Sequence, residues 1–234
     1  MTDRFADTTP RQAAIVAGYG FLLTLIAVTF ATLYVENLIV PGDAAATANN
    51  IMASEGLYRF GIVSWLFVII GDMVRAWALY VFFKQVHKSL ALFAAWFMLV
   101  HDAILGVTLV NLIFGSVLLS GAGYLTVFDP TQLQALVLLF SNGFNYGFQI
   151  GLFFFSFHLL ILGYLVYKSG FVPKILSPLL ILASLGYSIN SVGKILSSNF
   201  PEIIWTVFVL PMIVGESALI LWLVFKGGKG STES

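Results

Sequence analysis

Residues 57–83 read LYRFGIVSWLFVIIGDMVRAWALYVFF, a long apolar run that contains Asp72 and Arg75. A helix needs about 20 apolar residues to cross a hydrocarbon core of roughly 30 Å, so this run is long enough to span a membrane. A charged side chain near the middle of such a helix costs at least roughly 2.5–3.5 kcal/mol and nearly always faces the protein interior. The run therefore predicts a transmembrane helix with one face packed against other helices.

The composition of the whole chain fits a membrane protein. Of its 234 residues, 59% are hydrophobic and 9% are charged, and the mean hydropathy is +0.97. A soluble domain has roughly 25% charged residues, because its surface must be hydrated. A formal net charge of zero gives no basic surface for nucleic acid. The lack of cysteine excludes disulfides, thiolate metal sites and cysteine nucleophiles.

Six apolar segments are long enough to cross the membrane. They predict an all-α, polytopic protein with one transmembrane domain over residues 1–234, a bundle of helices near 12–35, 57–83, 89–119, 142–167, 175–197 and 202–225. Residues 131–140 are too few for a seventh crossing, so we expect them to extend the fourth helix. The polar N-terminus does not resemble a signal peptide, and we expect the first segment to be retained.

Lysine and arginine are unevenly distributed over the ends of these segments. Cytoplasmic loops of membrane proteins carry an excess of both residues. With the N-terminus inside, the outer ends hold only Arg59 and Lys194, whereas the cytoplasmic ends hold Arg4, Arg11, Lys84, Lys88, Lys168, Lys174, Lys226 and Lys229. We therefore expect both termini in the cytoplasm.

Ionisable residues recur at one depth in four of the segments. With a rise of about 1.5 Å per residue, each lies roughly 13–20 Å from the cytoplasmic ends. The principal candidates for a ligand- or ion-binding site are Asp72, Arg75, His158 and Glu216, and His101 and Asp102 are secondary candidates. Asp72 and Arg75 are three residues apart, so they can pair on one helix face. A carboxylate such as Glu216 must be protonated, paired across helices or bound to a metal, because ionised isolation in the membrane is too costly.

Metal or haem binding follows as a hypothesis from the same residues. Imidazoles and carboxylates suit a first-row metal, and His158, Glu216 and Asp72 would be the ligands. The chain has no HxxxH or HExxH motif. His101 and His158 could instead ligate haem axially, so the cofactor stays open.

A second set of polar residues lies in the outer halves of the segments. Asn145 and Gln149 share a face of the fourth segment, and Asn190 lies at similar depth in the fifth. Amide side chains commonly join membrane helices. The alternative is a vestibule that leads from outside to the charged residues.

Several strings in the chain resemble a bacterial membrane family known as domain of unknown function number 4386. They are LIVPGDAAATA (38–48), ALYV (78–81), LSGA (119–122), TQLQA (131–135), HLLILGY (158–164), SG (169–170) and GE (215–216). The resemblance runs from about residue 12 to residue 227 and implies a multi-pass protein of the bacterial cytoplasmic (inner) membrane. Asp72, His158 and Glu216 fall on its pattern, whereas His101 and Asp102 do not. The family implies no activity.

Three functions are consistent with these features. The first is binding or transport of a small ligand, ion or proton at the buried polar site. The second is a structural or partner subunit of a membrane complex, and the third is an intramembrane metal-dependent hydrolase. The short loops leave little room for chemistry outside the membrane, so the sequence favours a protein that is not an enzyme. The expected partners are the lipid bilayer, a small ligand or ion, and a second copy or another membrane protein.

Overall fold

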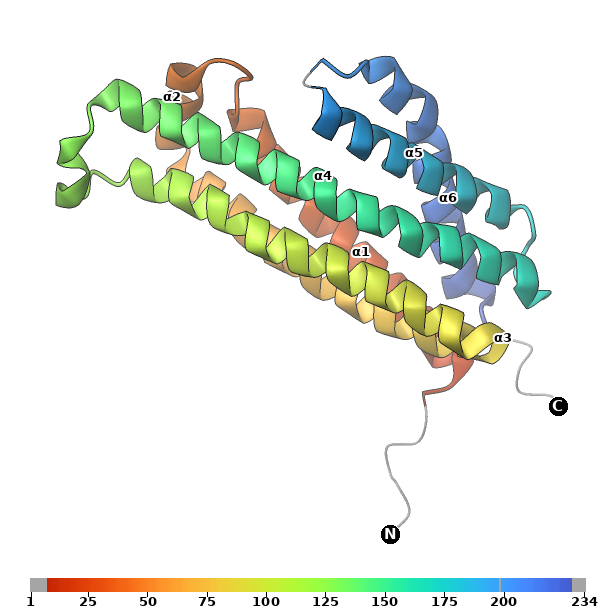
Figure 1. Ribbon diagram of the computed structural model, residues 1–234. Coiled ribbons are helices and arrows are strands. Elements are labelled where there is room, and N and C mark those ends of the chain that lie inside the picture. Colours follow the sequence, from red (N-terminus) through yellow and green to blue (C-terminus); the bar gives the residue numbers. More distant parts are fainter. Residues whose placement is uncertain (1–7, 198, 229–234) are drawn as a thin grey trace, which may run out of the picture. The chain divides into compact units, whose positions relative to one another are not determined.

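The computed structural model describes residues 8–197 and 199–228, and this part of the chain is helical without any strand. The elements are α1 (Pro10–Tyr34), η1 (Glu36–Leu38), α2 (Ala44–Ala53), α3 (Glu55–Leu118), η2 (Gly123–Val127), α4 (Pro130–Ser169), α5 (Leu176–Leu196) and α6 (Glu202–Lys226), as Figure 1 shows. The prediction of an all-α protein is confirmed. Arg4 and Lys229, used above for the orientation, lie outside the described residues.

Five helices in the described part are long and apolar enough to cross a membrane: α1, α3, α4, α5 and α6. In their most apolar windows only 28–50% of residues are buried, so large apolar side chains face outward. An outward apolar surface needs lipid around it. The chain is therefore a membrane protein.

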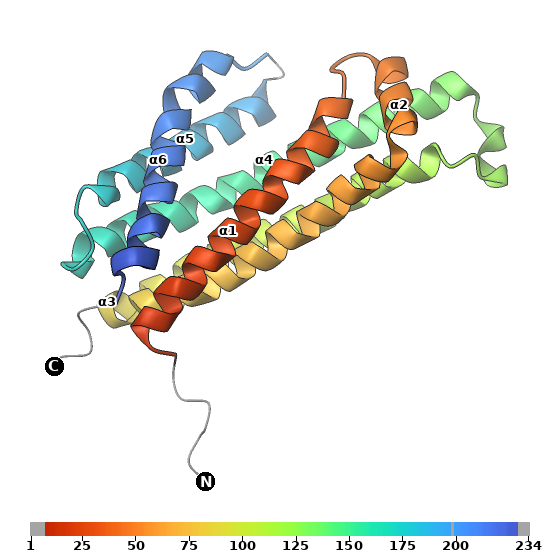
Figure 2. The same ribbon diagram turned by 180° about the vertical axis from the view of Figure 1, so that it is seen from behind.

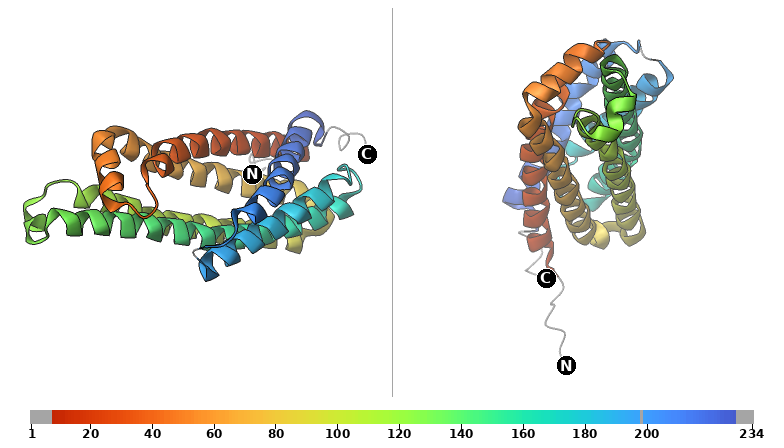
Figure 3. Two further views of the ribbon diagram at one scale, coloured as in Figure 1. Left: turned by 90° about the horizontal axis from the view of Figure 1, so that it is seen from above. Right: turned by 90° about the vertical axis from the view of Figure 1, so that its left-hand side faces the viewer.

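The helix α3 holds two of the expected spans. Its backbone departs from helical geometry at His87, where φ is −161° and ψ is 99°. The Nδ1 atom of His87 accepts a hydrogen bond from the backbone N–H of Leu90, which helps to start the second arm. The two arms run side by side (Figure 3). In the described part of the chain, the five helices thus provide six segments that are long enough to cross a membrane.

The connections begin new helices through side-chain caps. Asp43 accepts a hydrogen bond from the backbone N–H of Ala46 at the start of α2. Asp129 and Gln132 form a reciprocal capping box before α4, with Pro130 in the first helical position. Residues 131–140 belong to the same helix as residues 142–167.

The chain divides into two compact units, and α1, α3 and α4 contribute to both. The described residues of unit 1 are 8–22, 71–102, 149–197 and 199–228. Unit 2 comprises Leu23–Ile70 and Ala103–Phe148. In unit 2, the Tyr58 hydroxyl donates to the Leu112 carbonyl and so joins the arms of α3. The Trp65 ring packs on Phe144, with 5.5 Å between their ring centroids.

Unit 1 has its own apolar core, and the hairpin of α5 and α6 belongs to it. The Cα of Gly215 on α6 allows the backbone of α5 to come close, because a Cβ there would lie 3.1 Å from the Leu179 carbonyl carbon. Arg11 donates from Nη1 to the carbonyl oxygens of Leu223 and Gly227, which joins the start of α1 to the end of α6 (Figure 2).

One end of unit 1 collects basic residues. The Phe82 ring lies 5.7 Å from the Phe171 ring and 6.4 Å from the Trp222 ring, between centroids. These contacts bring together the part of α3 before its break, the loop after α4 and the C-terminal part of α6. The basic residues at this end, called the basic end below, are Arg11, Lys84, Lys88, Lys168, Lys174 and Lys226.

Candidate functional site

Arg75 lies at the centre of a buried polar cluster in unit 1. Its Nη2 atom is 3.0 Å from Oδ1 of Asp72 on the same arm of α3, and both side chains are almost wholly buried. This is the ion pair that a spacing of three residues predicts. Its Nη1 atom faces α6, where Oε2 of Glu216 lies 3.7 Å away. One guanidinium therefore contacts two carboxyl groups from two helices.

Glu216 has a second partner on α5. The Tyr187 hydroxyl donates a hydrogen bond of 3.1 Å to Oε1 of Glu216. Tyr187 also packs edge-on against Phe155 of α4, with 5.2 Å between ring centroids. Arg75, Glu216 and Tyr187 thus link α3, α6 and α5, and together with Asp72 they form what we call the Arg75 cluster.

Aromatic rings cover the guanidinium. The Cζ atom of Arg75 lies 5.6 Å from the centroid of Phe21 on α1 and 5.7 Å from that of Phe155 on α4. A cation over an aromatic face gains electrostatic attraction, and more of it where water is excluded. The Sδ atom of Met98, on the second arm of α3, is 3.9 Å from Nη2. Aromatic rings and Met98 thus enclose the guanidinium, and Arg75 is buried.

His158 lies in the same part of unit 1 and bonds to the backbone. Its Nδ1–H donates to the Ala94 carbonyl at 2.9 Å, because that oxygen can only accept. Two cavities of about 10 Å³ each touch the ring. Arg75 and Glu216 line the first cavity, and Tyr80 and Ala91 line the second. His158 thus lies between the Arg75 cluster and the apolar core.

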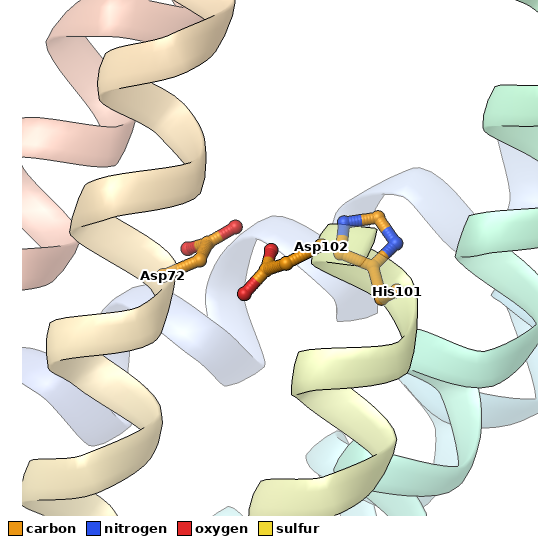
Figure 4. A group of neighbouring side chains, drawn as sticks. All are labelled: Asp72, His101 and Asp102. Carbon is orange, nitrogen blue, oxygen red and sulfur yellow. The ribbon is translucent and has the colours of Figure 1, made fainter. Parts of the chain in front are cut away.

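Two further ligand-type side chains, His101 and Asp102, converge beside Asp72. Asp72 comes from the first arm of α3, while His101 and Asp102 come from the second, and Figure 4 shows the two carboxyl groups facing each other. One candidate ligand atom from each residue lies within 4.8 Å of the others. All three side chains are buried. We call Asp72, His101 and Asp102 the carboxylate–histidine group.

Small and aromatic residues of α4 position His101. A Cβ at Gly151 would lie 2.9 Å from the Nδ1 atom of His101, so only glycine leaves the ring its place. The centroid of Phe155 lies 5.4 Å from that of the imidazole. Gly151 and Phe155 are four residues apart and share one helix face. The sequence of α4 thus accommodates His101 on α3.

Charge is not balanced in this site. The carboxyl groups of Asp72 and Glu216 contact the guanidinium of Arg75, and the carboxyl group of Asp102 lies beside Asp72 without a cation of its own. The two histidines add positive charge only when they are protonated. The arrangement suits a species that carries positive charge, either protons or a metal ion.

The comparison with known protein families identifies the same family as the sequence strings quoted above, from LIVPGDAAATA (38–48) to GE (215–216). The family model described as "Domain of unknown function (DUF4386)" matches residues 16–227. The chain belongs to this family. It is also 29% identical, over 170 residues, to an "Uncharacterized protein" of Archaeoglobus fulgidus. The aligned region covers 73% of this chain and 85% of the relative. No solved structure matches the chain.

The expected outer polar residues of this DUF4386 member are divided between the units. In unit 1, Nδ2 of Asn190 lies 3.5 Å from Oε1 of Gln149, a long hydrogen bond between α5 and α4. Ser156 and Ser188 join the same helices more tightly, with 2.6 Å between their Oγ atoms. Asn145 belongs to unit 2, where its side chain is exposed. These contacts in unit 1 match the role of amides in packing membrane helices.

The structure pairs the site residues in a way that the sequence analysis did not foresee. Among the described residues, Asp72, His101 and Asp102 form the group with metal-ligand spacing, and the expected set of His158, Glu216 and Asp72 does not. Tyr187, which the sequence analysis did not list as a candidate, contacts Glu216. A polar aromatic residue in the middle of an apolar helix was the available signal for it.

Proposed function

We propose that this DUF4386 member binds a small cation, either a proton or a metal ion, at the polar site of unit 1, and that it transports or senses this cation. The observation that carries the proposal is an excess of carboxyl groups: Asp72 and Glu216 share the guanidinium of Arg75, and Asp102 lies beside Asp72. In a membrane-spanning region, an ionised carboxylate without a counter-charge is too costly to persist. Protonation or a bound cation provides that counter-charge.

The size of the cavities supports a very small ligand. The cavity lined by Arg75, His158 and Glu216 measures about 10 Å³. A single water molecule needs roughly 10–15 Å³ on this measure. A proton, a water molecule or a bare ion fits such a space, and an organic molecule does not. The same argument weighs against an intramembrane hydrolase, which must admit a substrate beside its metal.

The basic end supports a location in the cytoplasmic membrane of a bacterium with both termini inside. Span ends that are rich in lysine and arginine lie on the cytoplasmic side of membrane proteins. Arg11 in the first turn of α1 and Lys226 in the last turn of α6 both belong to the basic end. The family resemblance supports the bacterial inner membrane as the location.

Reconstitution into lipid vesicles tests the proposal. The purified chain would be assayed for uptake of protons, Na⁺, K⁺ and Mn²⁺, and for binding of each ion in detergent. We expect one of these cations to bind or cross, and Glu216→Gln to reduce that activity at least tenfold. Glu55→Gln is the matched control, because Glu55 pairs with Arg59 at an exposed position. No binding or flux of any tested cation by the wild-type protein contradicts the proposal.

A structural or partner subunit is the second candidate function. It is favoured by the way in which Arg75, Glu216 and Tyr187 join three helices, which would hold them in register. The outward apolar surface would then meet a second copy or another membrane protein. In that case Glu216→Gln lowers the amount of folded or assembled protein. Neither the wild type nor any variant then binds a cation.

A further inference from the structure

The geometry of the carboxylate–histidine group points to a specific ligand, and we propose that Asp72, His101 and Asp102 bind one divalent first-row transition-metal ion. This inference rests on the proposed function and names the cation. The three side chains provide one imidazole nitrogen and two carboxylate oxygens, which suit zinc, iron, manganese or cobalt. Calcium and magnesium prefer sites made of oxygen alone.

The separation of the ligand atoms is close to that of a filled site. In a tetrahedral site, ligands at roughly 2.0–2.2 Å from zinc lie about 3.4 Å from one another. The candidate atoms of Asp72, His101 and Asp102 lie within 4.8 Å of one another. Small rotations about the side-chain torsions close a difference of about 1.4 Å, with no change in the helices. Three protein ligands leave a fourth position for water.

Asp102 gives an independent indication of a ligand. Its side chain is only 3% exposed, and neither Oδ1 nor Oδ2 has a hydrogen-bond partner among the described residues. Figure 4 shows its carboxyl group directed at Asp72 and the space between the arms of α3. A buried polar group without a partner costs about 1–3 kcal/mol, and more when it is charged. A metal ion bound to this carboxylate gives it the partner and the counter-charge that it lacks.

The neighbours of the group already have the form of an outer ligand shell. Arg75 holds Asp72 through Oδ1 at 3.0 Å, which orients that carboxylate. The His101 ring lies against Gly151 and Phe155, and these residues fix its direction. Outer partners of this kind orient metal ligands and raise affinity about 10–100-fold.

Charge also favours a divalent ion over a monovalent one. Asp72, Asp102 and Glu216 exceed Arg75 by two negative charges when both histidines are neutral. An ion of charge +2 balances this excess. Arg75 stays paired with Asp72 and Glu216 in such a state, so the ion completes the Arg75 cluster without displacing any of its contacts.

Metal binding by the full-length protein in detergent is the test. After treatment with a chelator, the wild-type chain would be titrated with Zn²⁺ in a calorimeter and with Co²⁺ while the visible spectrum is recorded. We expect binding of one equivalent of Zn²⁺, and absorption bands of Co²⁺ with mixed nitrogen and oxygen ligands. Absence of both signals from folded wild-type protein overturns the inference, whatever the variants do.

Variants then identify the ligands. Asp102→Asn and His101→Gln should each weaken Zn²⁺ binding at least 100-fold, since they remove a ligand and not merely an outer partner. Glu55→Gln is the matched control, because it removes a carboxylate from an exposed pair with Arg59 in unit 2. Equal binding by all three variants and the wild type contradicts the assignment.

The outcomes separate this inference from the proposed function. Proton, Na⁺ or K⁺ activity that depends on Glu216, in a protein without metal binding, sinks the inference and keeps the proposed function. Zinc binding that depends on Asp102, without transport of any ion, supports the inference and leaves cation sensing as the role of the site. If the wild-type protein shows neither metal binding nor binding or transport of any tested cation, both the inference and the proposed function are contradicted.

Discussion

The guanidinium of Arg75 reaches across from α3 to α6 and lies 3.7 Å from the carboxylate of Glu216. The same side chain holds Asp72 at 3.0 Å. Two helices distant in the sequence thus share one positive charge. The stability of unit 1 should therefore depend on this residue more than on any surface ion pair.

Replacing Arg75 by glutamine tests that dependence. Arg75→Gln leaves Asp72 and Glu216 without their cation, and breaking a buried pair in this way costs about 3–5 kcal/mol. Unfolding in detergent, followed by circular dichroism, measures the loss. Arg59→Gln is the control, because the Glu55–Arg59 pair has side chains 57% and 58% exposed, and exposed pairs contribute about 0.2–1 kcal/mol. Equal losses in the two variants contradict the central role of Arg75.

The Tyr187 hydroxyl should contribute a smaller and separable amount. Tyr187→Phe removes the hydrogen bond to Glu216 but keeps the ring that packs on Phe155. Side-chain hydrogen bonds between membrane helices average about 0.6 kcal/mol and reach about 1.7 kcal/mol. We expect a loss in that range by the same unfolding measurement. Combining Tyr187→Phe with Glu216→Leu should cost less than the sum, since each change removes the same hydrogen bond.

Gly151→Ala should disturb His101 without touching any charge. The added Cβ would lie 2.9 Å from Nδ1 of His101, and overpacking of this kind costs about 1–3 kcal/mol. Gly56→Ala is the matched control on α3, because no heavy atom lies within 4 Å of its added Cβ. Alanine favours helix by about 1 kcal/mol over glycine, so the control should be neutral or stabilising. Unfolding in detergent measures the stability of both variants. If Gly151→Ala is as stable as the wild type, the position of His101 does not require a glycine at residue 151.

The fold could be predicted from the sequence because hydropathy and helix length are local properties. The spans, the capping residues Asp43 and Asp129, and the Asp72–Arg75 pair all depend on residues close together in the chain. The break at His87 was less visible, since residues 84–89 contain no proline or glycine. The chain reverses direction there through the extended backbone of His87, and the hydrogen bond from the Leu90 N–H to His87 Nδ1 starts the second arm of α3.

The site could be predicted only in part, for a geometric reason. Counting residues along a helix gives the depth of a side chain, but not the direction in which it points once helices pack. Depth placed Asp72, His101, Asp102, His158 and Glu216 together. The packing of the two arms of α3 decides that His101 and Asp102 face Asp72, while His158 bonds to Ala94. The relevant contacts are long-range, and a single sequence does not contain them.

Asp129 should make the start of α4 sensitive to acid. Hydrogen bonds from the Thr131 hydroxyl and the Gln132 backbone N–H favour the carboxylate and hold the pKa of Asp129 below its usual range. A lowered pKa in the folded state stabilises the cap fully above the unfolded pKa of about 3.9. That contribution is lost as the pH falls through the folded pKa.

Amide hydrogen exchange at Gln132 measures this effect. Protection there should decline on acidification through that range, after correction for the intrinsic effect of pH on exchange. Asp129→Asn keeps an acceptor for the cap but cannot titrate, so its corrected protection should not vary with pH. The same pH dependence in both proteins rules out Asp129 as the titrating group.

The orientation can be tested directly because the chain contains no cysteine. A single introduced cysteine is therefore the only thiol that a membrane-impermeant reagent can label. Lys88→Cys and Lys174→Cys place an exposed thiol at the basic end, and Val127→Cys places one at a position 79% exposed, in η2 between α3 and α4. With both termini inside, intact cells should label Val127→Cys, and the other two only after permeabilisation. The reverse pattern would place the basic end outside, against the positive-inside rule that predicts this topology.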